Sequence, residues 1–190
     1  MTKTRLLLAC SLATSLTAMS AGAVLLDDFE SYLLGSVRDQ APANTVWDTN
    51  GSGLPQILSE SGNQYMGWDW SASGYRGAHR DLGGEVIGAT ETSTVFFRFR
   101  QSNETGDDAI GVTDLNDPGT QTAGFPSFRA GINMVDDGNA TNNLYDLKAG
   151  GTTITTGLSE GTWYNAWLVI DNATDTMDVY IRWHQQADCR

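Results

Sequence analysis

The stretch from Trp163 to Trp183 constrains the fold more than any other part of this 190-residue chain. A continuous apolar run, 163–170, comes first, and the six residues after it are rich in Asn and Asp, which favour turns. The run that follows, 177–183, alternates and places four apolar side chains on one face: Met177, Val179, Ile181 and Trp183. The stretch therefore predicts a β-hairpin. We expect its first strand to have packed layers on both sides and its tryptophans to belong to the core.

The rest of the chain also shows the two-residue period of strands. The runs 94–100 and 127–135 alternate between apolar and polar residues, and clusters of Gly, Asn and Asp separate many short runs. No long window after the N-terminal segment has a helical period. The sequence therefore predicts an all-β, antiparallel β-sandwich that forms a single domain over 24–190.

The first 23 residues have the features of a secretory signal peptide. Lys3 and Arg5 precede an apolar segment that is too short to span a bilayer, and the small residues Ala21-Gly22-Ala23 follow it. We expect cleavage after Ala23, which predicts a secreted or periplasmic protein. Cleavage before Cys10, as in a lipoprotein, is the alternative.

The mature chain is strongly acidic. Without Lys3 and Arg5 it has nine basic residues against 23 acidic ones, a formal charge of −14. Such a surface repels nucleic acid and anionic membranes, so we expect neither as a partner. Cys189 would be the single remaining cysteine, which excludes an intrachain disulfide. We expect no membrane span in the mature chain, and a monomer.

Several stretches together resemble secreted bacterial proteins with the concanavalin A-like, or laminin G-like, jelly-roll fold. They are Asp27-Asp28-Phe29-Glu30-Ser31-Tyr32, which we expect to form a first strand and turn, Val95–Arg100, Gly111–Asp114 and Trp163–Trp167 with the strand after it. The resemblance implies two facing antiparallel sheets, with glycan or protein ligands held on a concave face or at the loop rim. Such folds normally continue past the last hairpin, so we hypothesise that the domain is incomplete at its C-terminus, through truncation or a shifted reading frame.

The sequence offers little catalytic chemistry. Glycanases with this fold commonly carry Glu-x-Asp-x-x-Glu on one strand, where the carboxylates flank the glycosidic bond. None of the six glutamates has an Asp two positions later. We expect no nucleophile elbow, and the two histidines, His79 and His184, leave few options for a triad. Enzymatic activity therefore stays open, with a non-catalytic role favoured.

Carbohydrate binding has better support, because sugar rings stack on exposed aromatic faces while planar polar groups bond their hydroxyls. We select six candidates: Trp68, Trp70, Tyr75, Arg76, Arg98 and Arg100. Trp68 and Trp70 share one face of a strand and form either a platform or part of the core. Arg98 and Arg100 share the non-core face of their strand with Phe96, which predicts either a ligand face or a solvated surface.

Calcium is a second candidate ligand. Oxygen-bearing side chains cluster in acidic segments, where Asp107, Asp108, Asp114, Asn116 and Asp117 are the candidate ligands. None of these segments has EF-hand spacing, and Asp and Asn are also ordinary turn residues. The sequence therefore establishes no cofactor, and calcium stays a candidate ligand.

Two classes of function follow from the sequence. The first is a secreted, non-catalytic, lectin-like module whose partner is an extracellular or cell-surface glycan. The second is a structural or protein-interaction domain of the cell envelope that binds no glycan. A glycan hydrolase or lyase is a third and weaker reading.

Overall fold

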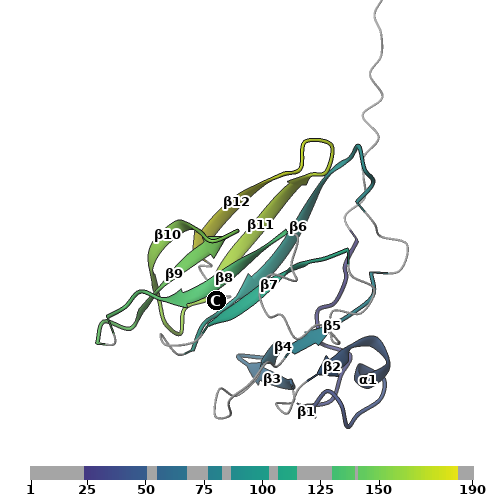
Figure 1. Ribbon diagram of the computed structural model, residues 1–190. Helices are drawn as coiled ribbons and strands as arrows, with labels where there is room; N and C mark the ends of the chain where they lie inside the picture. The colour runs from purple at the N-terminus through teal and green to yellow at the C-terminus, as the bar shows by residue number, and fades with distance from the viewer. Residues whose placement is uncertain are drawn as a thin grey trace, which may run out of the picture.

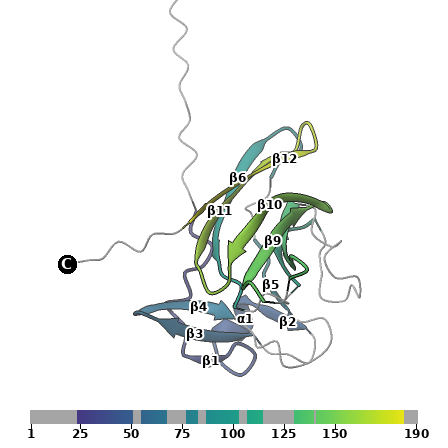
Figure 2. The same cartoon turned by 90° about the vertical axis from the view of Figure 1, so that its left-hand side faces the viewer.

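A computed structural model of the chain describes residues 24–50, 55–67, 77–82, 87–102, 107–114, 130–139 and 141–183. Nearly all of its regular structure is antiparallel sheet, and one short helix, α1 (Ala43–Val46), interrupts it. Two main sheets face each other, and smaller sheets lie at one end of them (Figures 1 and 2). The predicted all-β, antiparallel sandwich is confirmed. No helix in the described segments is long and apolar enough to cross a membrane.

The first main sheet contains the predicted hairpin. Its strand order is β12 (Thr176–Trp183), β11 (Tyr164–Asp171), β6 (Thr92–Phe99). The turn between β11 and β12 is held by the Asp171 side chain, whose Oδ1 accepts hydrogen bonds from the backbone N–H groups of Ala173 and Thr174 at 3.0 and 3.3 Å. Asp175 takes a left-handed conformation there, with φ of 55°. The Asn- and Asp-rich segment thus closes the hairpin as its composition predicted.

The second main sheet has four strands in the order β10 (Thr152–Ser159), β9 (Leu144–Ala149), β8 (Ala130–Asp136), β7 (Asp108–Val112). Each strand is antiparallel to its neighbour, so the chain meanders from β7 to β10. Gly150 and Gly151 form the β9–β10 turn at φ values of 54° and 82°, which L-residues with a side chain rarely adopt.

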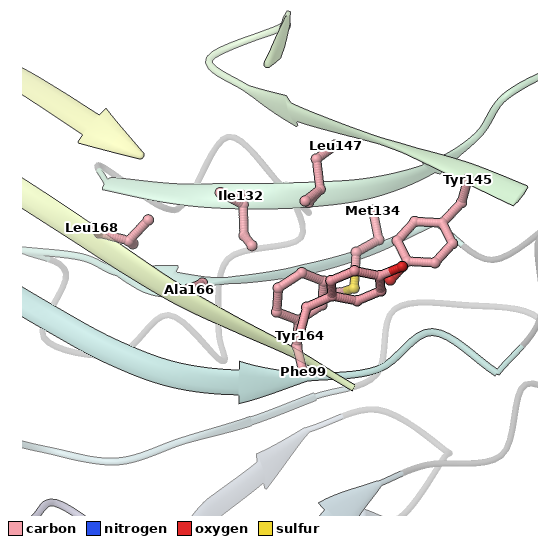
Figure 3. Packing of buried hydrophobic residues seen from close by; sticks show 8 residues of the cluster. All are labelled: Phe99, Ile132, Met134, Tyr145, Leu147, Tyr164, Ala166 and Leu168. Carbon is pink, nitrogen blue, oxygen red and sulfur yellow. The ribbon is translucent and has the colours of Figure 1, made fainter. Parts of the chain in front are cut away.

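The main core fills the space between these two sheets (Figure 3). Eight buried side chains form it, four from each sheet: Phe99, Tyr164, Ala166 and Leu168 facing Ile132, Met134, Tyr145 and Leu147. The first, third and fifth residues of both β8 and β11 are buried, which is the pattern of strands with one face on the core. Each large apolar side chain buried in this way contributes about 1.5–3 kcal/mol of transfer free energy.

A smaller core lies under the N-terminal segment. β1 (Gly35–Ser36), β3 (Gln56–Glu60) and β4 (Asn63–Gly67) form one sheet, and β2 (Asp48–Asn50) pairs with β5 (Gly77–His79). The buried residues of this smaller core are Tyr32 and Val37 of the N-terminal segment, Ala43 of α1 and Ile57 of β3. We call β1, β3 and β4 the small sheet.

The predicted first strand at residues 27–32 is absent. Instead Asp27 folds this segment around its carboxylate: Oδ1 accepts the Phe29 N–H at 2.8 Å, and Oδ2 accepts the Tyr32 hydroxyl at 2.7 Å and Trp47 Nε1–H at 2.8 Å. Arg80 pairs with Asp27 at 3.2 Å. Phe29 adopts φ of 65°, a left-handed conformation incompatible with a strand. The opening residues therefore form a hydrogen-bonded turn.

Candidate ligand-binding face

One face of the β12–β11–β6 sheet points away from the main core. Tyr164, Ala166 and Leu168 of β11 are buried, so the residues that alternate with them face the other way. We call this surface the outer face. Apart from Trp183 at the end of β12, the exposed residues of β6 and β12 pair with these outward-facing residues of β11 and lie on the same face, whereas the half-buried apolar residues between them pack against the core. The prediction that β11 has packed layers on both sides is therefore wrong: its two neighbouring strands expose their outer side chains.

The strand register places three aromatic residues in a line across this face. Trp167 pairs with Phe96 of β6 on one side and with Tyr180 of β12 on the other. The side chains of Phe96 and Tyr180 are 51% and 57% exposed. The ring centroids of Phe96 and Trp167 are 5.3 Å apart with an interplanar angle of 43°. We call Phe96, Trp167 and Tyr180 the aromatic row; two strand spacings give it a length of about 10 Å.

A polar row lies beside the aromatic row. Two residues from the aromatic row on each strand, Asn165 of β11 pairs with Arg98 of β6 and with Arg182 of β12. Both arginines are exposed, and neither forms a salt bridge with a residue that the structure describes. The Arg98 guanidinium carbon lies 5.3 Å from the ring centroid of Trp163, within the range of a cation–π contact. The aromatic row and the planar hydrogen-bonding groups of the polar row are therefore neighbours on the outer face, two residues apart on each strand.

A cluster of four side chains ties the end of this face to the small sheet. Glu60 accepts hydrogen bonds from Arg100 Nη1, at 2.7 and 2.8 Å, and from Trp163 Nε1 at 2.7 Å. Arg100 Nη2 also donates to the Tyr65 hydroxyl at 3.1 Å, and the Tyr65 and Trp163 rings meet edge-to-face at 5.2 Å. We call Glu60, Tyr65, Arg100 and Trp163 the Glu60 cluster. It joins β3 and β4 to the ends of β6 and β11.

The electrostatics of the Glu60 cluster favour the ionised carboxylate. The hydrogen bond from Trp163, and then that from Arg100, hold the pKa of Glu60 below its usual range. Because Arg100 is engaged by Glu60 and Tyr65, it is committed to this contact. Arg98, beside it on the outer face, keeps its guanidinium directed at solvent and the Trp163 ring.

The structure describes two of the six carbohydrate-binding candidates chosen from the sequence. Arg98 and Arg100 both lie at the end of the outer face, Arg98 in the polar row and Arg100 in the Glu60 cluster. The other four carbohydrate-binding candidates, which are Trp68, Trp70, Tyr75 and Arg76, lie outside the described residues. The structure thus describes the face that carries Phe96, Arg98 and Arg100. The binding platform of Trp68 and Trp70 stays a prediction.

The sequence does not reveal the aromatic row because Phe96 comes from a strand far from the hairpin in sequence, although Trp167 and Tyr180 lie within it. The first strand of the hairpin, which contains Trp167, is also predicted to be covered on both sides. The assignment of the hairpin tryptophans to the core is wrong: none is among the buried residues, and Trp183 is 60% exposed. A usable signal is the parity of Trp167 and Tyr180: both point away from the face that carries the buried Ala166 and the partly buried Ile181.

The calcium candidates do not converge in the part of the fold that is described. Asp107 and Asp108 are at the start of β7, whereas Asp114 follows its other end, about 13 Å or more along the strand. Asn116 and Asp117 lie outside the described residues. Burial, and then the neighbouring charge of Asp108, raise the pKa of Asp107. No group of three or more His, Cys, Asp or Glu side chains in the described ranges could hold a metal ion.

One pentapeptide matches the Gly-x-Ser-x-Gly pattern, contrary to the expectation that the chain has no such motif: Gly157-Leu158-Ser159-Glu160-Gly161. A nucleophile elbow places its serine between a strand and a helix. Ser159 is instead the last residue of β10, and a turn leads from it directly to β11. The match therefore lacks the geometry of an elbow. Of the two histidines, the structure describes His79. Its Nε2 lies 3.8 Å from Oδ2 of Asp48, which is its partner residue on the paired strands β5 and β2.

No protein-family model matches this chain, and no curated protein is significantly similar to it in sequence. The class that can be assigned is therefore structural, an all-β antiparallel sandwich, and the functional argument depends on the outer face.

Proposed function

We propose that this protein is a secreted or periplasmic, non-catalytic glycan-binding module of the jelly-roll type, and that the outer face is its binding surface. The observation that carries the proposal is the aromatic row. Three rings from three adjacent strands lie side by side on a sheet face, and the two outer rings are more than half exposed. Soluble proteins rarely leave aromatic side chains grouped in this way without a binding role.

The chemistry of the neighbouring residues favours a sugar ligand. The apolar faces of sugar rings stack on aromatic rings, and their hydroxyls need donors and acceptors at the rim. Arg98, Asn165 and Arg182 supply planar amide and guanidinium groups next to the row. Because the row lies across an open sheet surface, it suits a chain segment of several sugar units better than a single enclosed sugar.

A protein partner is the second candidate, since an exposed apolar row with an arginine rim also occurs in protein interfaces. The observation that favours it is the exposure of Trp183 and Tyr180 together at one edge of the sheet. Under this reading the chain is an interaction domain of the envelope.

A glycan array on residues 24–190, with and without calcium, tests the proposal. We expect Trp167→Ala and Phe96→Ala to abolish binding while the far-UV circular dichroism stays unchanged. Ile154→Ala is the matched control, because Ile154 is exposed on β10 of the other main sheet. Trp68→Ala with Trp70→Ala tests the platform predicted from sequence. Binding that survives the loss of Trp167 and Phe96, or no binding by the unmodified chain, would refute the proposal for this face.

A further inference from the structure

The strand β12 is the edge of its sheet. In the described part of the fold it pairs with β11 on one side only, over all eight of its residues. An edge strand presents a row of unpaired backbone N–H and C=O groups, which is a template for another strand. Natural edge strands are usually short, bulged or interrupted by proline, whereas β12 is long, regular and free of proline.

The sequence of β12 is complementary to itself when two copies run antiparallel. With Tyr180 opposite Tyr180 of a second copy, Asp178 of each copy faces Arg182 of the other on the outer face. On the opposite face Val179 meets Ile181, and Met177 meets Trp183. Both charges are therefore paired with an opposite charge, and each apolar residue is paired with an apolar one.

This register is the one that the side chains specify. A slip by one residue would put the outer-face residues of one copy opposite the core-facing residues of the other. A slip by two residues in either direction would place Asp178 or Arg182 opposite Tyr180, and both Asp–Arg pairs would be lost. Within one copy the partners of Asp178 and Arg182 across the sheet are Val169 and Asn165, so neither charge is matched there.

Trp183 gives an independent reason for a partner at this edge. Its side chain is 60% exposed although its strand neighbours on the same face, Met177, Val179 and Ile181, pack against the main core. In the paired strands the Trp183 side chain would lie against Met177 of the second copy. This contact is favourable because the polarisable thioether of methionine interacts well with aromatic rings.

We propose that two copies of this chain form a symmetric dimer through antiparallel β12–β12 pairing. The two sheets then become one continuous six-stranded sheet, with an isologous interface around Tyr180. The aromatic rows of the two copies join end to end across the interface and double in length. The proposal stands on the β12 edge and does not depend on the ligand of the outer face.

Charge reversal at Asp178 and Arg182 tests the proposal without disturbing the core, because both side chains are exposed. Sedimentation equilibrium of residues 24–190, from micromolar to about millimolar protein, should show a dimer. D178R puts two positive charges on each strand and R182D two negative charges, so each variant alone should dimerise more than about tenfold more weakly. The doubly reversed chain, D178R with R182D, should recover the dimer.

An equimolar mixture of the two single variants is the decisive sample. Each strand then meets only opposite charges, so a heterodimer should form from two chains that fail to self-associate. An unfolded chain would not be recovered by mixing, and the mixture therefore also controls for folding. Amide hydrogen exchange should show that β12 is more protected in the dimer than in the dilute protein. A wild-type monomer at every concentration, as predicted from the sequence, or single variants that dimerise like wild type would overturn the proposal.

Discussion

Replacing Glu60 by alanine removes the carboxylate that joins the small sheet to the sandwich. The Trp163 bond is charge-assisted, and because the Glu60 side chain is 45% exposed we take the lower end of the usual range, about 1.5 kcal/mol. The Arg100 pair, at 2.7 Å, is partly screened by solvent and contributes about 0.5 kcal/mol. Glu60→Ala should therefore lower the free energy of unfolding by about 2 kcal/mol, equivalent to about 4–8 °C in Tm for a domain of this size.

A double-mutant cycle isolates the Glu60–Trp163 contact. Trp163→Phe retains a ring but removes the indole N–H, and should cost about 1.5 kcal/mol. In the double variant the two losses should overlap by about 1.5 kcal/mol, because the hydrogen bond can be lost only once. Urea unfolding followed by far-UV circular dichroism measures all four proteins without depending on tryptophan fluorescence.

Two outcomes would refute this reasoning. If the two single effects add to within about 0.3 kcal/mol, Glu60 and Trp163 do not interact in solution. If Glu160→Ala, which removes a carboxylate for which no contact is seen among the described residues, destabilises as much as Glu60→Ala, the effect is one of general charge.

We also expect amide exchange in β3 and β4 to rise more than in β8 when Glu60 is removed, since the cluster holds the small sheet in place.

Three further predictions concern stability. The pKa of Glu60 is lowered in the fold, so its contribution is present above the ordinary carboxyl range and lost as the pH falls through the lowered value; the stability difference between wild type and Glu60→Gln should shrink in acid. Burial and the hydrogen bond to Asp27 raise the pKa of Tyr32 to about 12, so its contribution is complete below pH ~10 and lost toward pH 12, and an absorbance titration near 295 nm should lose one late-titrating tyrosine in Tyr32→Phe. Leu168→Ala should destabilise by about 2–5 kcal/mol because the residue is fully buried, whereas Leu33→Ala, at a 72% exposed position, should stay within about 0.5 kcal/mol by urea unfolding.

The alternation of apolar residues predicted the main sheets well. Ile132 and Met134 of β8 and Phe99 of β6 are buried as their two-residue period implies, because burial on one face of a strand follows directly from the pleat. The outer face could not be predicted in the same way. Whether Trp167 is covered depends on the presence of another layer. Its alignment with Phe96 depends on a register fixed by pairing between strands that are far apart in the sequence.

The opening segment shows a different limit. Its apolar and acidic residues favoured a strand, but Asp27 gathers bonds from the Phe29 backbone, the Tyr32 hydroxyl and the Trp47 indole, and this network determines the local conformation. Trp47 lies 20 residues away in sequence. A local pattern does not contain the information that such a contact will form, so propensity is overridden by tertiary structure.

The order of strands in the β12–β11–β6 sheet affects how the chain can fold as it is synthesised. β6 has β11 as its only strand neighbour among the described elements, and 65 residues separate the paired Phe99 and Tyr164 (Figure 1). At about 5–20 residues per second the ribosome needs about 3–13 s to cover that interval. Throughout it, Phe97 and Phe99 lack the strand that completes their side of the core. A nascent chain that ends before Tyr164 should therefore remain open to protease and to chaperones, and should become resistant only after β11 has emerged.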